Sequence, residues 1–414
     1  MKKDFLAPLT LCASFTCQAG DYFFEPAFNA NERYDSNLFM FQRPQQGNWI
    51  TTLSPSLDFG LRHETGEIKS RLTWNQLLYT NQSELDIDEQ LVDVDYKHKT
   101  ERFLWGVESF YRNQSSLNTE ADGSGLLFSQ VMSKRYHLAP NAVYSVNERN
   151  TLIIDYSYDN VRYAQNRNAI NLSDYDYHQI SGTLNRIYSE RDTLNATVSV
   201  SRYSTPVQEQ IAYNHVAQLG WQHHFSEQLN ANVSAGVNYS EVESTVPTTL
   251  FYGFLPNGTP FYIDPNTGFL TTQQRFRDLK NNNFGPVYQA SIQKSFDQGS
   301  VSLMASQNQT PTSRGLQTHT ELALASTYSI SERWTAGLST NYSSNEITGE
   351  QNNPFNRIYY SFGANVNWKW TPEINLGLSY TYRQQEFQNN SEPSIGNIVQ
   401  LQFSYHPQIN RQVK

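Results

Sequence analysis

The chain has 414 residues, of which 14% are aromatic, and it carries a formal net charge of −9. This negative balance argues against nucleic acid as a partner. Its two cysteines, Cys12 and Cys17, both lie near the N-terminus, so the remaining chain has no thiol for catalysis, disulfides or thiolate metal sites.

The N-terminus is typical of an export signal. Lys2 and Lys3 precede an apolar-leaning run, which closes on the small residues Cys17-Gln18-Ala19 before Gly20. That run is too short for a membrane-spanning helix. We therefore predict that residues 1–19 are a signal peptide and that residues 20–414 form a single domain.

A short polar turn recurs along this domain. Its copies are Glu64-Thr65-Gly66-Glu67, Thr100-Glu101-Arg102, Asn147-Glu148-Arg149, Ser189-Glu190-Arg191, Ser226-Glu227-Gln228, Asp297-Gln298-Gly299-Ser300, Ser331-Glu332-Arg333 and Thr371-Pro372-Glu373. Successive copies are separated by roughly forty residues, which suits a repeated unit of turn, strand, loop and strand. Short turns that alternate with longer loops are typical of an outer-membrane barrel.

Between the turns, apolar and polar residues alternate. In 194–202, Leu194, Ala196, Val198 and Val200 share one face and polar residues the other. Segments 231–240, 358–370 and 374–383 repeat this pattern, with Tyr or Trp at the ends of the apolar face. A period of two places each set on one face of a strand. Aromatic residues at the ends of an apolar face indicate a wall that faces lipid.

Eight turns imply about eighteen strands, from 22–32 to 396–406. Sixteen strands are the alternative, because the pattern does not divide 114–146 and 242–283 clearly. We therefore predict an all-β protein, a transmembrane up-and-down antiparallel β-barrel in the outer membrane. The last strand, with Phe403 and Tyr405 on one face, resembles the C-terminal strand that the barrel-assembly machinery reads. That machinery and outer-membrane lipid are the partners this implies.

By parity, the inward faces are rich in Ser, Thr, Asn, Gln and Gly with scattered charges. The candidate lumen residues are Asp58, Arg62, Arg71, Glu108, Arg112, Asp155, Asp159, Lys369 and Arg383. Such a wall suits a hydrated channel for neutral or weakly charged solutes. The alternative is that these residues only solvate one another, but eighteen strands enclose more space than side chains fill.

Segment 242–280 is long and aromatic for a loop. Its candidate mouth residues are Phe251, Tyr252, Phe254, Phe261 and Tyr262. One interpretation is that the segment folds into the channel mouth and offers rings for sugars to stack on. The alternative is a self-packed external hairpin without a ligand.

The sequence shows no catalytic or cofactor motif. It has neither His-Glu-x-x-His nor a glycine-rich phosphate loop. We expect no cofactor, no metal and no enzymatic activity. A barrel-type hydrolase stays a third alternative, since nine His and many Ser and Asp make chance triads inevitable.

The segment Tyr34-Asp35-Ser36-Asn37-Leu38 resembles an element of a family of outer-membrane β-barrel porins encoded among exopolysaccharide or exosortase genes. Leu53-Ser54-Pro55-Ser56-Leu57 resembles the family's second strand. The resemblance implies a porin-like channel, with an exported polysaccharide and its export apparatus as partners. A general diffusion porin and a structural or adhesive barrel are the alternatives. Asp35 and Asn37 also have a plain interpretation as turn-capping residues.

Overall fold

The structure is a computed structural model that describes residues 20–407, apart from 121–124, 126–129, 165–171, 207–209, 248–249, 255–259, 264–269, 273–275, 349–352 and 389–391. The predicted signal peptide, residues 1–19, lies outside the described residues.

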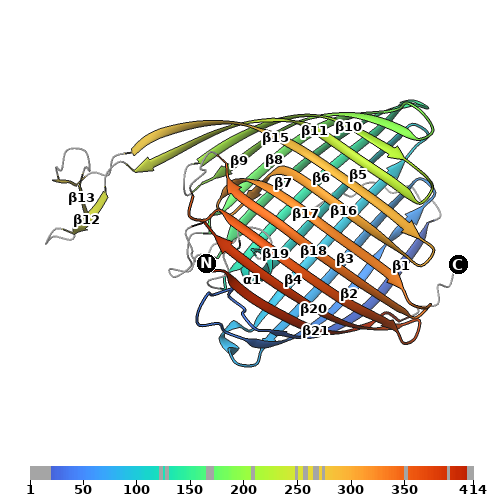
Figure 1. Ribbon diagram of the computed structural model, residues 1–414, viewed down its shortest axis with the longest axis horizontal. Helices are drawn as coiled ribbons and strands as arrows, with labels where there is room; N and C mark the ends of the chain where they lie inside the picture. Colours follow the sequence, from blue (N-terminus) through green and yellow to red (C-terminus); the bar gives the residue numbers. More distant parts are fainter. Residues whose placement is uncertain are drawn as a thin grey trace.

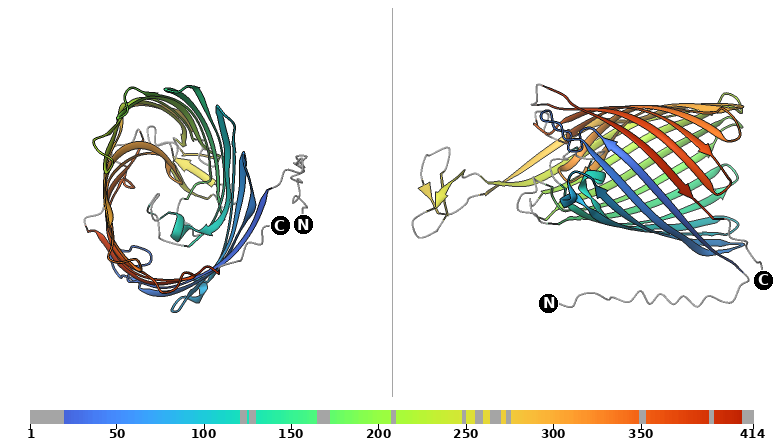
Figure 2. Two further views of the ribbon diagram at one scale, coloured as in Figure 1. Left: turned by 90° about the vertical axis from the view of Figure 1, so that its right-hand side faces the viewer. Right: turned by 90° about the horizontal axis from the view of Figure 1, so that it is seen from below.

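Eighteen antiparallel strands form one closed barrel (Figures 1 and 2). They are β1 Asp21–Asp35, β2 Asn48–His63, β3 Gly66–Tyr79, β4 Ile87–Lys99, β5 Phe103–Ser115, β6 Met132–Asn147, β7 Asn150–Tyr163, β8 Tyr175–Ile187, β9 Asp192–Thr205, β10 Gln210–His224, β11 Leu229–Pro247, β15 Phe276–Phe296, β16 Gly299–Thr312, β17 Gly315–Ser329, β18 Trp334–Ile347, β19 Arg357–Lys369, β20 Ile374–Phe387 and β21 Ser394–Tyr405. The predicted fold class and the predicted count of eighteen are confirmed.

The barrel closes where β1 pairs with both β2 and β21. Closure matters because an open edge in hydrocarbon would leave backbone N–H and C=O groups unpaired. Among the described residues, the helical elements are the short α1 (Ser116–Thr119) and the 3-10 turn η1 (Ser83–Leu85). Neither has the length or the apolar character to cross a membrane as a helix.

The recurring polar turns all join neighbouring strands at one rim. Their first residue explains why the pattern repeats. Oγ of Ser331 accepts hydrogen bonds from the N–H groups of Arg333 and Trp334, at 3.3 and 3.2 Å. The equivalent first residues Ser189, Ser226, Thr371 and Asn147 cap their turns in the same way. A short side chain that bonds its own backbone fixes such a turn locally.

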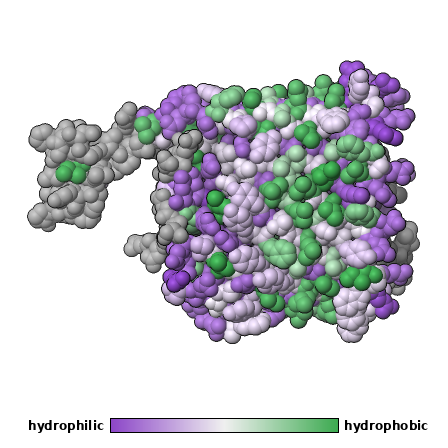
Figure 3. Space-filling view, viewed as in Figure 1, coloured by the Kyte–Doolittle hydropathy of each residue, from purple (hydrophilic) through white to green (hydrophobic). Residues whose placement is uncertain are grey.

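The apolar residues of the alternating strands face outward and form a belt around the barrel. Figure 3 shows this belt on one face, between two polar rims. On β9, Val198 is 63% exposed, whereas the intervening polar residues face inward. Near the short-turn rim, the rings of Trp334 and Trp368 stack at 5.3 Å between centroids. A belt edged by aromatic rings is the lipid-facing surface of an outer-membrane barrel, and the protein is located in that membrane.

The orientation of the barrel gives a labelling prediction. Asn81 and Glu148 lie in loops at opposite rims of the barrel, and both residues are exposed. We expect Asn81→Cys to react with a membrane-impermeant maleimide on intact cells. Glu148→Cys should react only after the outer membrane is permeabilised, because short turns face the periplasm. Reaction of Glu148→Cys on intact cells would contradict this orientation.

Candidate functional site in the barrel lumen

The nine predicted lumen residues lie on strand faces opposite the exposed apolar residues. Asp155, for example, follows the outward-facing Ile154, and Lys369 lies between Trp368 and Trp370. The structure does not bring the nine together into one cluster. They are distributed over β2, β3, β5, β7, β19 and β20.

Most of these charges are paired across neighbouring strands. Nε of Arg71 donates to Asp58 at 2.5 Å, and Nζ of Lys69 lies 3.6 Å from the same carboxylate. Arg62 pairs with Glu67 at 2.5 Å. Arg112 pairs with Asp93 at 3.3 Å. Paired charges of both signs give this wall no strong field of a single sign.

A mixed aromatic and charged cluster joins β5, β6 and β7. The rings of Phe110 and His137 stack with 4.6 Å between their centroids. The guanidinium of Arg112 lies 4.2 Å from the centre of the Phe110 ring. Asp159 accepts hydrogen bonds from Arg135 at 2.6 Å and contacts His137 Nδ1 at 3.0 Å. The sequence analysis identified Arg112 and Asp159 but missed the other three. The inward parity of Arg135 and His137 was readable only once the region 114–146 could be divided into strands.

The opposite wall is almost uncharged. On β9, β10, β11, β15 and β16 its inward residues include Ser199, Ser201, Asn214, Gln218, Ser234, Asn238, Gln289, Ser291, Ser302 and Ser306. Some of these polar side chains bond one another. The amide Nδ2 of Asn238, for example, donates to the hydroxyl Oγ of Ser240 at 3.2 Å. Hydroxyls and amides can exchange hydrogen bonds with a neutral polar solute as readily as with water.

Helix α1 begins segment 116–131, which follows β5, and Figure 2 shows this helix inside the ring of strands. A buried carboxylate holds its base. Oε1 of Glu89 accepts from the N–H of Ser115 at 3.0 Å and from Asn118 Nδ2 at 2.8 Å. The backbone N–H of Ser116 donates to the carbonyl of Val131 at 2.8 Å, which joins the two ends of the segment. Ser115 caps α1 by accepting from the N–H of Leu117.

Segment 36–47, between β1 and β2, also packs inside the barrel. Its Leu38, Phe39 and Met40 form a buried cluster with Ile50, Leu77, Tyr79 and Leu117. The last of these belongs to α1, so the two inward segments share one apolar core. Burial of this apolar surface stabilises both segments within the lumen.

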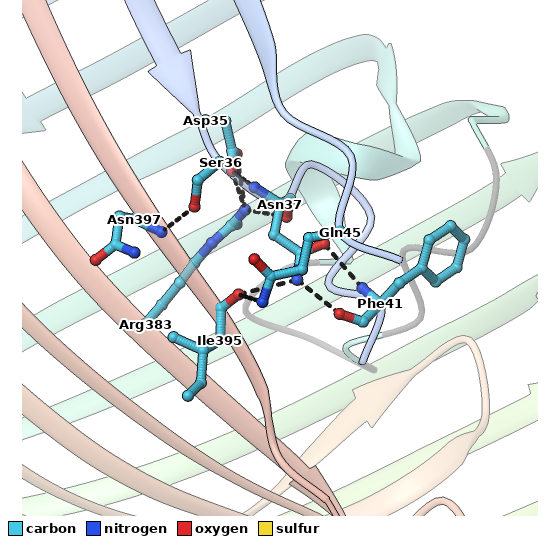
Figure 4. A network of polar contacts seen from close by, with 8 residues as sticks. All are labelled: Asp35, Ser36, Asn37, Phe41, Gln45, Arg383, Ile395 and Asn397. Atoms are coloured by element: carbon cyan, nitrogen blue, oxygen red, sulfur yellow. Dashed lines mark hydrogen bonds and ion pairs between the residues drawn. The ribbon is translucent and has the colours of Figure 1, made fainter. Parts of the chain in front are cut away.

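Polar residues fix segment 36–47 to the seam between the first and last strands (Figure 4). Nη2 of Arg383 donates to both carboxylate oxygens of Asp35 at 2.7 Å and to the carbonyl of Asn37 at 2.9 Å. Asn37 Nδ2 donates to the carbonyls of Phe41 and Ile395 at 2.7 and 2.9 Å. The N–H of Asn37 donates to Asp35 at 3.0 Å, which confirms the plain interpretation of these residues as turn-capping residues.

Segment 116–131 is also held from other parts of the wall. Oε1 of Glu120 accepts from Tyr163 Oη at 2.5 Å, and Oε2 accepts from Ser313 Oγ at 2.9 Å. Gln385 Nε2 lies 3.5 Å from the carbonyl of Gly125. A side chain at Gly125, whose φ is +71°, would meet Arg357 at 2.6 Å. The segment that starts on β5 therefore reaches β7 on one side and β19 and β20 on the other.

The turn between β16 and β17 bends inward as well. Tyr203 Oη on β9 donates to the carbonyl of Thr312 at 2.9 Å, and the N–H of Ser173 donates to the carbonyl of Ser313 at 3.0 Å. Gly315 has a φ of +124°, which a residue with a side chain rarely adopts. The sequence analysis missed these contacts. In the sequence, the loop before Tyr175 and the turn between β16 and β17 have only the pattern of connections between strands.

The predicted mouth aromatics are placed elsewhere. Phe251, Tyr252 and Phe254 belong to β12 (Leu250–Phe254), while Phe261 and Tyr262 belong to β13 (Pro260–Ile263). With β14 (Leu270–Thr271) these strands form a separate three-stranded sheet. The sheet lies beyond the rim, at the end of the extended β11–β15 hairpin (Figure 1). This position differs from the predicted inward fold and agrees with the alternative of an external hairpin.

In the part of the chain that the structure describes, no group of three or more His, Cys, Asp or Glu side chains is placed to hold a metal ion. The ionisable residues of the lumen instead bond one another and the inward segments.

No family model and no curated protein sequence matches the chain. Solved structures of outer-membrane proteins share its barrel fold. The ferric-catecholate import receptor Fiu from E. coli K12 has a TM-score of 0.49 at 8% identity, over 92% of this chain and 81% of that chain. Pseudomonas aeruginosa OccK2, in complex with glucuronate, has a TM-score of 0.47 at 8% identity, over 93% and 98%. OpdK of the same organism, with vanillate, has a TM-score of 0.46 at 10% identity, over 93% and 98%. These likenesses concern the barrel fold alone.

Proposed function

We propose that the protein is a passive outer-membrane channel whose lumen is narrowed by segments 36–47 and 116–131. Its solutes are small, polar molecules of low net charge. The observation that carries this proposal is the inward position of α1, which Glu89, Glu120 and their partners hold from several strands. A loop without a role in the lumen would not need a buried carboxylate at its base.

The chemistry of the two walls supports this class of solute. The charged wall of β2 to β7 carries paired charges, such as Asp58 with Arg71, so a passing ion meets little net attraction. The wall of β9 to β16 offers hydroxyl and amide groups that replace the water around a neutral solute. Both features favour uncharged, hydroxyl-rich molecules.

Export of an exopolysaccharide is the second candidate, and the family resemblance implies it. The same uncharged wall favours it, because amides and hydroxyls bond the units of a neutral polysaccharide as well as a single sugar. The chain of such a polymer would have to pass the section that segment 116–131 narrows. The polysaccharide export apparatus and the barrel-assembly machinery belong to this proposal as partners.

Single-channel conductance in a planar bilayer tests the proposed function. Replacing residues 117–130 with a short Gly-Ser linker should raise conductance several-fold, because ions then meet a wider lumen. Deletion of residues 248–271 is the matched control. It removes the external sheet with Phe251 and Tyr262, and conductance should stay unchanged.

Two outcomes would contradict the proposal. Folded protein that conducts neither before nor after replacement of 117–130 would indicate a structural, adhesive or enzymatic barrel. Equal conductance of the wild type and the 117–130 variant would show that α1 does not narrow the path. Block by a neutral polysaccharide, but not by its monosaccharide, would favour the polymer as solute.

A further inference from the structure

Three basic residues lie on the outward faces of β6, β7 and β9, near the outer ends of these strands. They are Lys134, Arg162 and Arg202, which we call the basic rim patch. Each follows the apolar residues of its own strand on the same face. On β9, Val198 and Val200 precede Arg202, and on β7 the exposed Ile154 precedes Arg162. The patch therefore begins where the lipid-facing belt ends.

Strand register places two of these cations side by side and the third two strands away. Lys134 lies directly opposite Arg162 in the pairing of β6 with β7. Like charges directly opposite each other on neighbouring strands repel. Arg202 lies opposite His178, and Asp176 is two residues from His178 on β8. The patch spans four neighbouring strands. Two carboxylates lie beside it: Asp176 on β8, and Asp174, which accepts from the N–H of Tyr163 at 2.8 Å.

The patch holds one guanidinium rigidly and leaves two cations available. Nη2 of Arg162 donates to both oxygens of Asp176 at 3.0 and 2.8 Å, and Nη1 donates to two backbone carbonyls at 2.9 Å. Among the described residues, neither Lys134 nor Arg202 forms an ion pair. Both are exposed. An anion arriving from outside would relieve the repulsion and bond free donors.

The remainder of this rim has the opposite character. The outward residues near the outer ends of other strands include Glu32 on β1, Asp88 on β4, Glu346 on β18 and Glu386 on β20. Lys280 on β15 is bound by Glu241 and Glu243. Lys134 on β6 and Arg202 on β9 thus differ from these outward residues, because they carry positive charge and no ion pair is formed by either among the described residues.

Aromatic residues lie next to the basic rim patch, on the side toward the apolar belt. Tyr136 on β6 is exposed, and Tyr158 on β7 stacks on His178 at 4.6 Å. Tyr156 Oη lies 2.9 Å from His178 Nδ1. Amphipathic rings of this kind occupy the level between acyl chains and headgroups. The phosphates of an outer-leaflet lipid would lie just above that level, beside the three cations.

We propose that the basic rim patch binds a phosphorylated glycolipid of the outer leaflet. Its acyl chains would lie along Ile154, Ile180 and Val198, and its phosphates would bond Lys134 and Arg202. Cations placed at an anionic membrane surface attract such headgroups, and Arg donates to phosphate through two parallel hydrogen bonds. The proposal rests on the membrane position of the barrel and not on the proposed channel function.

Binding of purified lipopolysaccharide to the folded protein in neutral detergent tests this inference. Lys134→Gln combined with Arg202→Gln should weaken binding by about ten-fold or more, as expected for two charge-assisted hydrogen bonds. Lys280→Gln is the matched control, because it removes a cation from the same rim that is already paired. It should bind as the wild type does. Heat-modifiable gel mobility shows that each variant is folded.

The lipid itself provides the second arm of the experiment. Enzymatically dephosphorylated lipopolysaccharide should bind the wild type as weakly as intact lipid binds the double variant, and millimolar inorganic phosphate should not displace intact lipid. Equal binding of intact and dephosphorylated lipid would overturn the proposal. So would equal weakening by Lys280→Gln, or full displacement by phosphate, which would indicate a free-anion site.

Discussion

Asp35→Ala is expected to lower the free energy of unfolding by about 3–5 kcal/mol, the usual cost of removing one partner from a buried ion pair. Asp35 is 2% exposed and Arg383 is 8% exposed. Without the carboxylate, the guanidinium of Arg383 stays buried beside the seam. It then keeps its hydrogen bond to the carbonyl of Asn37 but loses its anionic partner. The loss should also release segment 36–47 from β20 and β21.

Urea titration of the refolded protein, followed by heat-modifiable gel mobility, measures this effect. Asp58→Ala is the matched control, because its partner Arg71 has a side chain that is 51% exposed. That guanidinium stays hydrated, and the cost should be about 1 kcal/mol or less. Asp35→Leu combined with Arg383→Met should recover much of the stability, since it removes both buried charges. A cost for Asp35→Ala no larger than for Asp58→Ala would contradict the role assigned to this pair.

Val198→Arg is expected to destabilise the barrel by about 2–4 kcal/mol, the cost of an arginine at the lipid-facing midplane of a barrel. Val198 is on the outward face of β9. The charge would have to lie in hydrocarbon or move toward the rim. Folding yield in lipid vesicles, read from gel mobility, should fall accordingly.

Ser199→Arg is the control for this prediction. Ser199 neighbours Val198 but faces the lumen, where an arginine keeps its water. Asn238 would not serve, although it also faces inward, because it is 1% exposed and bonds Ser240. Sequence parity alone predicts that an arginine at Asn238 is tolerated, but from its burial we expect Asn238→Arg to lower the folding yield. Equal folding yields for Val198→Arg and Ser199→Arg would overturn the assignment of faces.

Sequence by itself determined the wall of this protein. Apolar and polar residues alternate with a period of two in 194–202 and 374–383. This pattern is local, and it specifies the two faces of a strand without contacts from the rest of the chain. The capped turns at Ser189, Ser331 and Thr371 are equally local, since each first residue bonds N–H groups two and three residues later. The faces of these strands and the position of these turns follow from the two local rules, and the predicted count of about eighteen strands rests on them.

The tertiary structure alone decided what lies inside and beyond that wall. Asp35 meets Arg383 across 348 positions of sequence, and Glu120 meets Ser313 across 193. No local pattern encodes such pairs, because strand register and barrel closure determine which residues share a level. For the same reason, the aromatic segment with Phe251 looked suited to the mouth but lies on a projecting sheet, while the less conspicuous helix α1 lies in the lumen. A loop folds inward where it finds buried partners, and the partners Glu89 and Tyr163 come from other strands.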